Sequence, residues 1–128
     1  MAPLPAVAAY PSDGGQTRLI PTPVTPRGAV VGVLIGISGR LSGEVYKVHD
    51  GENRMGRLKS ADIALDARDD TVSREHALII HQDGAFGLKP LRADNPTWVN
   101  GEQVDQGIPL SDGDQIRVGQ STFRFRTA

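Results

Sequence analysis

The sequence predicts an all-β domain, either a sandwich or a barrel. From residue 29 onward, short runs rich in β-branched and aromatic residues alternate with turn signals. No stretch of helical length keeps its apolar residues at a spacing of 3.6. The last run, 121–126, puts Phe123 and Phe125 on one face and polar residues on the other, which is the period of a half-buried strand. Many short strands at regular spacing favour this class.

Turn signals separate the predicted strands. Asn100-Gly101 is the strongest of them, because a two-residue hairpin turn needs positive φ at both positions. One strand is expected to end at Gly56-Arg57, and Val104 follows the Asn100-Gly101 turn. The other predicted strands cover residues 30–37, 44–49, 63–65, 77–81, 85–89, 98–99, 108–110, 115–118 and 121–126.

The chain divides by composition at about residue 28. Six of the nine prolines lie in the first 26 residues, which hold few large apolar side chains and show no clear period. Such a stretch cannot bury enough apolar surface to fold, so 1–28 is predicted to be a flexible Pro/Ala/Gly-rich tail. The remaining residues, 29–128, have the size of one ordinary domain.

Charge and cysteine content exclude several function classes. The chain has 14 Lys+Arg against 15 Asp+Glu and no Cys. Near-neutral charge gives no electrostatic argument for binding nucleic acid or a membrane surface. Absent cysteine excludes disulfides and thiolate metal sites, and no cofactor is expected. The longest apolar run is too short to span a bilayer and the N-terminus lacks the basic start of a secretory signal, so a cytoplasmic location is expected.

Three clusters of loop residues carry polar groups without an obvious turn role. They are Gly56-Arg57, the segment VSREHA at 72–77 and the segment NPTWVNG at 95–101. Together they offer guanidinium groups, a serine hydroxyl and a side-chain amide. Guanidinium groups give bidentate, charge-assisted hydrogen bonds to phosphate, and an amide can bond a peptide backbone. The clusters are therefore a set of donors for a dianionic oxyanion, although composition alone does not bring them together in space.

The order and spacing of these clusters resemble the forkhead-associated (FHA) domain, a phosphothreonine-binding antiparallel β-sandwich. The resemblance covers roughly residues 30–126. It rests on NRMGRLKSADIALDARDDTVSREHALI at 53–79, NPTWVNG at 95–101 and LSDGDQIRVGQSTFRF at 110–125. The style of these motifs is similar to that of bacterial members.

The resemblance implies a role for each matching residue. Arg57 would contact the phosphate or the adjacent peptide backbone, and Ser73 would donate its hydroxyl to a phosphate oxygen. Arg74 would be a second phosphate or peptide contact, and Asn95 would bond the peptide backbone beside the phosphothreonine.

Four further residues would support the site according to the resemblance. Gly56 would let the strand turn so that Arg57 points into the loops, and His76 would brace the Ser73 loop. Asn100 and Gly101 would form the hairpin that supports the Asn95 loop.

The chain departs from the family pattern around Asn95. Pro96 stands where the family has Gly, and Ala93 where Ser is common. Because proline restricts the residue before it, the Asn95 amide is expected to aim differently. Asp94 and the pair 69–70 would add negative charge near the phosphate. These features keep a rival function open, a phospho-independent interaction or scaffold module.

The function predicted from these residues is a phosphothreonine-dependent adaptor in Ser/Thr-kinase signalling that is not an enzyme. Its partners would be phosphothreonine proteins, among them a kinase or its substrates. Ser73 and His76 could be a nucleophile and its base, but the chain lacks the third member of such a set. His49, His76 and His81 match no usual metal-ligand spacing.

The tail contains a candidate for phosphorylation at Thr17. The resemblance implies a preference for a particular residue, often an aliphatic one, three positions after the phosphothreonine, and Ile20 stands at that distance from Thr17. Phosphorylated Thr17 would then bind the domain of its own chain or of a neighbour. The alternative is that the tail is a plain linker.

Overall fold

The computed structural model describes residues 28–65 and 68–128, and this part of the chain contains strands and turns but no helix. The five-stranded sheet has the order β10 (Ile108–Leu110), β7 (Ala85–Pro90), β6 (Ala77–Gln82), β4 (Gly51–Gly56), β5 (Ile63–Ala64). The six-stranded sheet has the order β3 (Val45–His49), β2 (Val30–Ser38), β12 (Ser121–Thr127), β11 (Gln115–Val118), β8 (Thr97–Val99), β9 (Glu102–Val104). The all-β prediction is confirmed.

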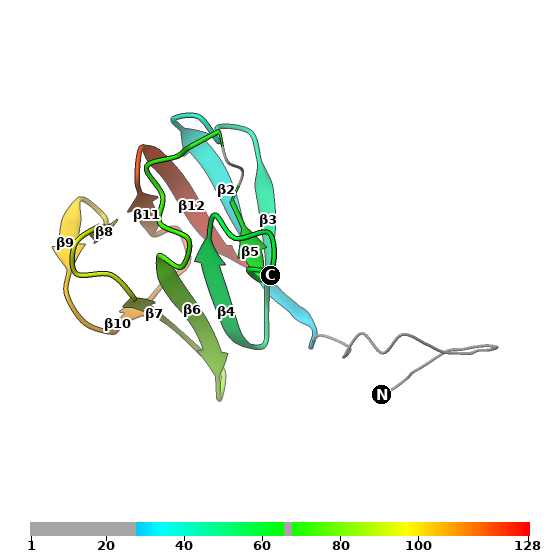
Figure 1. The fold of residues 1–128 in the computed structure, drawn as a ribbon. Coiled ribbons are helices and arrows are strands. Elements are labelled where there is room, and N and C mark those ends of the chain that lie inside the picture. Colours follow the sequence, from blue (N-terminus) through cyan, green and yellow to red (C-terminus); the bar gives the residue numbers. More distant parts are fainter. Residues whose placement is uncertain (1–27, 66–67) are drawn as a thin grey trace.

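The two sheets form the layers of a sandwich, with β4 and β6 in front of β2 and β12 in Figure 1. Neighbouring strands are antiparallel except for the short pair β4–β5, which is parallel. The sandwich is therefore mixed at one edge rather than antiparallel throughout.

The core confirms the predicted alternation in β12. Phe123 and Phe125 are fully buried between the sheets. The Phe125 ring contacts Phe86 edge to face, with centroids 4.8 Å apart, and Phe123 contacts Tyr46 in the same way at 5.9 Å. Each ring buries enough apolar surface to contribute about 1.5–3 kcal/mol to folding.

The start of strand β4 was not predicted, because polar residues interrupt the apolar pattern of this strand. Asn53 in its centre is fully buried. Its amide nitrogen donates to the carbonyls of His49 (2.8 Å) and Ile79 (3.2 Å), and its amide oxygen accepts from the His49 N–H (2.9 Å). Because these hydrogen bonds satisfy the amide, burying it costs little free energy. The bond to Ile79 also holds β4 against β6.

The Asn100-Gly101 turn between β8 and β9 has positive φ at both residues, 53° and 85°. Asp83 and Gly84 form a similar turn between β6 and β7, at 53° and 78°. The first turn confirms the hairpin signal at Asn100-Gly101, and in both turns the positive φ angles match the twist of the strands that the turn joins.

The strand register brings three loops to one end of the sandwich. Met55 near the end of β4 lies opposite Ala77 at the start of β6, and Ala77 lies opposite Pro90 at the end of β7. The segments that follow β4, precede β6 and follow β7 therefore leave the sheet side by side. These segments carry the polar clusters of the sequence.

Candidate functional site

The end of β4 is joined to the loop before β6 by backbone contacts. The Arg57 N–H donates to the Ser73 carbonyl (3.1 Å), and the Leu58 N–H donates to the Arg74 carbonyl (3.3 Å). A Cβ on Gly56 would lie 1.9 Å from the Arg74 carbonyl oxygen. Glycine is needed there for this close approach and not for a turn, since Gly56 is not among the residues with positive φ.

The Arg57 side chain is half-buried and held at one nitrogen. Its Nε–H donates to the Val72 carbonyl. Its two terminal nitrogens have no hydrogen-bond partner within residues 28–65 and 68–128. Arg57 and Ser73, which the sequence pattern placed in one site, therefore lie together, and the guanidinium group has donors left for a ligand.

Asn95 connects its loop to the loop of Ser73. Its Nδ2 donates to the Ser73 Oγ (2.8 Å) and to the Thr71 carbonyl oxygen (2.9 Å). The Ser73 hydroxyl is thus an acceptor here and keeps its own hydrogen for another partner. The Asn95 Oδ1 has no donor within the described segments, so it is the atom left to accept a hydrogen bond. Pro96 does not prevent this arrangement.

His76 lies fully buried beneath these loops. Its Nδ1 accepts a hydrogen bond from the Ser73 N–H (3.0 Å), so the ring proton is on Nε2, which donates to the Pro96 carbonyl (3.1 Å). Burial lowers the pKa of His76 below its ordinary value of 6.5, which favours this neutral form. One ring therefore bridges the loop of Ser73 and the loop of Asn95.

Comparison with known proteins matches residues 53–119, more than half of the chain, to the FHA domain model. The chain belongs to the FHA domain family. It is 34% identical over 114 residues to an oxoglutarate dehydrogenase inhibitor of Corynebacterium diphtheriae, covering 89% of this chain and 77% of the relative.

Two further comparisons place the FHA domain in context. It is 35% identical over 85 residues to the transcriptional regulatory protein EmbR of Mycobacterium tuberculosis, matching 66% of this chain and only 21% of that protein. A structure from an analysis of phosphothreonine-dependent FHA domain interactions superposes with a TM-score of 0.67 at 34% identity, covering 77% of this chain and 97% of the other.

Asp69 has a structural role in the FHA domain, although the sequence predicted only that it adds negative charge near the phosphate. Asp69 is 1% exposed, and its carboxylate accepts from the Thr71 N–H and hydroxyl, the Gln120 N–H (3.0 Å) and the Ser121 hydroxyl (2.6 Å). Burial alone would raise the pKa of Asp69, but the bonds from Ser121, Thr71 and Gln120 outweigh it and hold the pKa below 3.8. The Asp-x-Thr spacing, typical of an Asx turn, was the available signal.

Asp94 is balanced by a neighbour within the FHA domain. Arg92 donates to both oxygens of Asp94, Nε to Oδ1 and NH2 to Oδ2, each at 3.0 Å. This hydrogen-bonded ion pair keeps the pKa of Asp94 below its ordinary value. The negative charge of Asp94 therefore has its own counterion.

The remaining predicted residues of the FHA domain lie at different distances from this cluster. Arg74 is exposed, in the segment between Ser73 and His76. Asn100 and Gly101 lie at the far end of β8 from Asn95. The Asn100 side chain instead bonds the loop before β11, through Asp114 and the N–H of Gln115, so any support for Asn95 acts through β8. Thr17 lies outside the described residues.

The described segments of the FHA domain hold no helix long and apolar enough to cross a membrane. They also hold no group of three or more His, Asp or Glu side chains placed to bind a metal ion.

Proposed function

We propose that this FHA domain is an adaptor that binds phosphothreonine in partner proteins and has no catalysis of its own. One observation carries the proposal: Arg57, Ser73 and Asn95 come from three separate loops and meet at one end of the sandwich. A loop-borne site on a rigid sheet scaffold is the common arrangement for recognition.

Each group has the hydrogen-bonding capacity that a phosphorylated threonine requires. The terminal nitrogens of Arg57 and the hydroxyl hydrogen of Ser73 are donors for phosphate oxygens, and the exposed Arg74 is a further cation beside them. The Asn95 Oδ1 accepts a peptide N–H next to the phosphate. A phosphate dianion and an extended peptide backbone fit this combination.

The bonds of His76 argue against a hydrolytic role. A general base for Ser73 must accept a hydrogen bond from the hydroxyl group. The His76 Nδ1 instead accepts from the backbone N–H of Ser73, and its Nε2 donates to Pro96. Both ring nitrogens are therefore committed to holding loops.

The adaptor works in Ser/Thr-kinase signalling, because phosphothreonine is the product of such a kinase. Its partners are a phosphorylated protein, such as the kinase or one of its substrates, and it acts in the cytoplasm. A phosphorylated Thr17 of the chain's own tail is a ligand of the same chemistry and would compete with those partners.

Calorimetry with a phosphothreonine peptide library tests the proposal. Because each charge-assisted hydrogen bond contributes about 1.5–3 kcal/mol, Arg57→Ala or Ser73→Ala is expected to reduce affinity about tenfold to hundredfold while the fold survives. Arg126→Ala, an exposed arginine on the outer face of β12, is the matched control and should bind normally. Unchanged affinity in Arg57→Ala, or equal binding of unphosphorylated peptides, would overturn the proposal.

A further inference from the structure

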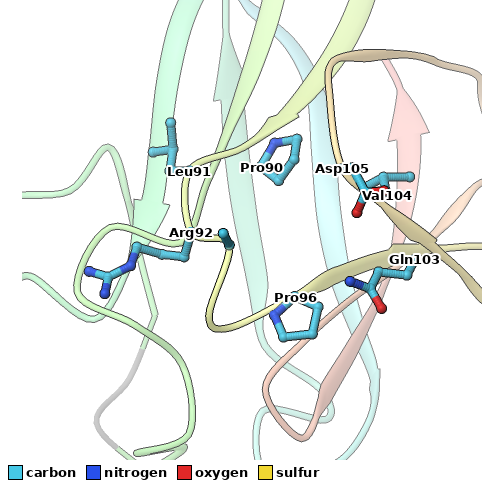
Figure 2. Close-up of a pocket in the computed structure, with 8 residues that line it drawn as sticks. Pro90, Leu91, Arg92, Pro96, Gln103, Val104 and Asp105 are labelled. Carbon is cyan, nitrogen blue, oxygen red and sulfur yellow. The ribbon is translucent and has the colours of Figure 1, made fainter.

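A pocket of about 410 Å³ lies directly beside the loop of Asn95, between that loop and strand β9 (Figure 2). Its apolar walls include Pro90 and Pro96 at the two ends of the loop, and Val104 of β9. Proline rings hold their backbone in a narrow range of φ, so these walls are largely preformed. Pro96 directly follows Asn95 in the chain, so the pocket borders the loop that carries Asn95.

Of the two charged residues that line the pocket, Arg92 has an ion-pair partner, and Asp105 has none among the described residues. Arg92 lines it, but Figure 2 shows the guanidinium directed away from Pro96 and Gln103, and Asp94 already pairs with that group. Asp105, on the opposite side, is exposed and makes no hydrogen bond or ion pair with another residue of the described part. One acidic group therefore remains beside the apolar walls.

We propose that this pocket binds an arginine or lysine side chain that flanks the phosphothreonine in the partner. The inference rests on the proposed function and adds a determinant of specificity to it. The aliphatic stem of such a side chain would pack on Pro90, Pro96 and Val104. Its cationic head would reach the carboxylate of Asp105, with the amide oxygen of Gln103 as a second acceptor.

The chemistry of the pocket favours a basic side chain over the alternatives. Lysine and arginine bury an apolar stem while their charged end stays in water, which suits an open pocket with an acidic rim. A glutamate or aspartate would meet Asp105 as a like charge. A leucine would fill the walls but leave the acceptors of Asp105 and Gln103 unused.

The partner would therefore present a bipolar motif. Its phosphate would bind the guanidinium and hydroxyl groups of Arg57 and Ser73, and its basic residue would bind on the other side of Asn95. Because the two parts carry opposite charge, a peptide with the basic residue in the wrong place would lose one of the two contacts. Two opposite charges at a fixed separation determine the position at which the peptide binds more than they raise its affinity.

The test uses the full chain and phosphothreonine peptides in which arginine, its neutral isostere citrulline or glutamate stands at each position in turn on both sides of the phosphothreonine. At one position we expect arginine to bind about threefold tighter than citrulline, the range of an exposed ion pair, and glutamate to bind more weakly than both. Backbone amide signals of Gln103 and Asp105 should shift with the arginine peptide and much less with the citrulline peptide.

Asp105→Asn should remove the preference for arginine over citrulline. The matched control is Glu102→Gln, which removes a neighbouring exposed acid that does not line the pocket and should keep the preference. Phosphate-dependent binding without an arginine preference, or a preference that survives Asp105→Asn, overturns the pocket proposal alone. Equal binding of phosphorylated and unphosphorylated peptides overturns the proposed function as well.

Discussion

The amide nitrogen of Asn95 lies 2.8 Å from the hydroxyl oxygen of Ser73, across a separation of 22 residues in the chain. The same nitrogen donates to the Thr71 carbonyl oxygen. Asn95 therefore performs two tasks with one side chain: its nitrogen fixes the loop of Ser73, and its oxygen remains available to a ligand.

This division of labour predicts a specific defect in Asn95→Asp. A carboxylate has the shape of the amide but no hydrogen to donate to Ser73 or Thr71, and it adds a negative charge beside the phosphate site. We expect phosphopeptide affinity to fall at least about tenfold, as for other lost bonds to charged groups, with little change in circular dichroism. Calorimetry measures the loss. Gln82→Glu, with the same added charge at the opposite end of β6, should bind normally.

Gly56 is expected to be intolerant of any side chain. Gly56→Ala puts a methyl group on the Arg74 carbonyl, which belongs to backbone and cannot move aside without shifting the Ser73 loop. Overpacking of this kind costs about 1–3 kcal/mol in the free energy of unfolding, measurable by urea denaturation. In Gly87→Ala, the nearest non-neighbouring atom is 3.5 Å away, so this variant should retain wild-type stability. Equal stability of both variants would contradict the close approach.

The resemblance in motif spacing was sufficient to predict that Arg57, Ser73 and Asn95 lie together. Arg57 follows β4, Ser73 precedes β6 and Asn95 precedes β8, and hydrogen bonds join the three segments at one end of the sandwich. The role of Gly56 was assigned to a turn, since a sequence shows a glycine but not the backbone that approaches it. The close contact with Arg74 appears only when two segments are placed in space.

The buried polar residues could not be predicted from the apolar pattern. Asn53 and Asp69 interrupt stretches that would otherwise be read as strand or as charged loop, and their burial depends on partners far along the chain. Asp69 bonds Ser121 over 52 residues. No local pattern contains such a contact, so Asp69 was interpreted as a charge near the ligand and not as a brace.

Asp69→Asn should destabilise the domain in a pH-dependent way. The folded-state pKa of Asp69 lies below 3.8, so its carboxylate contributes stability that is fully present above that value and is lost as pH falls through the folded pKa. We expect the variant to lose about 1.5–3 kcal/mol in urea unfolding at neutral pH, and the difference from wild type to vanish in acid. Asp70→Asn, an exposed neighbour, should show no such loss. If the difference in unfolding free energy between Asp69→Asn and wild type did not change with pH, the stabilising role of the ionised Asp69 carboxylate would be contradicted.

The pKa of His76 should lie below its ordinary value, and protonation of the ring should change the environment of the Ser73 amide. Because the folded pKa is lowered, the neutral ring adds stability that is complete above pH 6.5 and declines as pH falls toward the folded value. Protonating Nδ1 also removes the acceptor of the Ser73 N–H. In an NMR titration without peptide, the His76 ring and the Ser73 amide are expected to shift with one shared midpoint. Separate midpoints would break the proposed link.

Phosphorylation of Thr17 should bring the tail to the site described above. It adds about −1.5 to −2 charge and three acceptor oxygens. Val30 pairs with His49 at the end of the sandwich opposite to Ser73, and the nine residues of β2 span about 30 Å. The dozen residues before β2 extend to at most roughly 40 Å, so the tail reaches the site of its own chain only when it is nearly straight. In the phosphorylated chain, with Thr22 and Thr25 replaced by alanine, amide signals around Arg57 and Ser73 should shift, and added phosphopeptide should bind more weakly. The Ser73→Ala variant, phosphorylated in the same way, should show neither effect. If those amides do not move in the wild-type domain, recognition of its own tail is wrong, whereas shifts that grow with protein concentration assign the contact to a neighbouring chain.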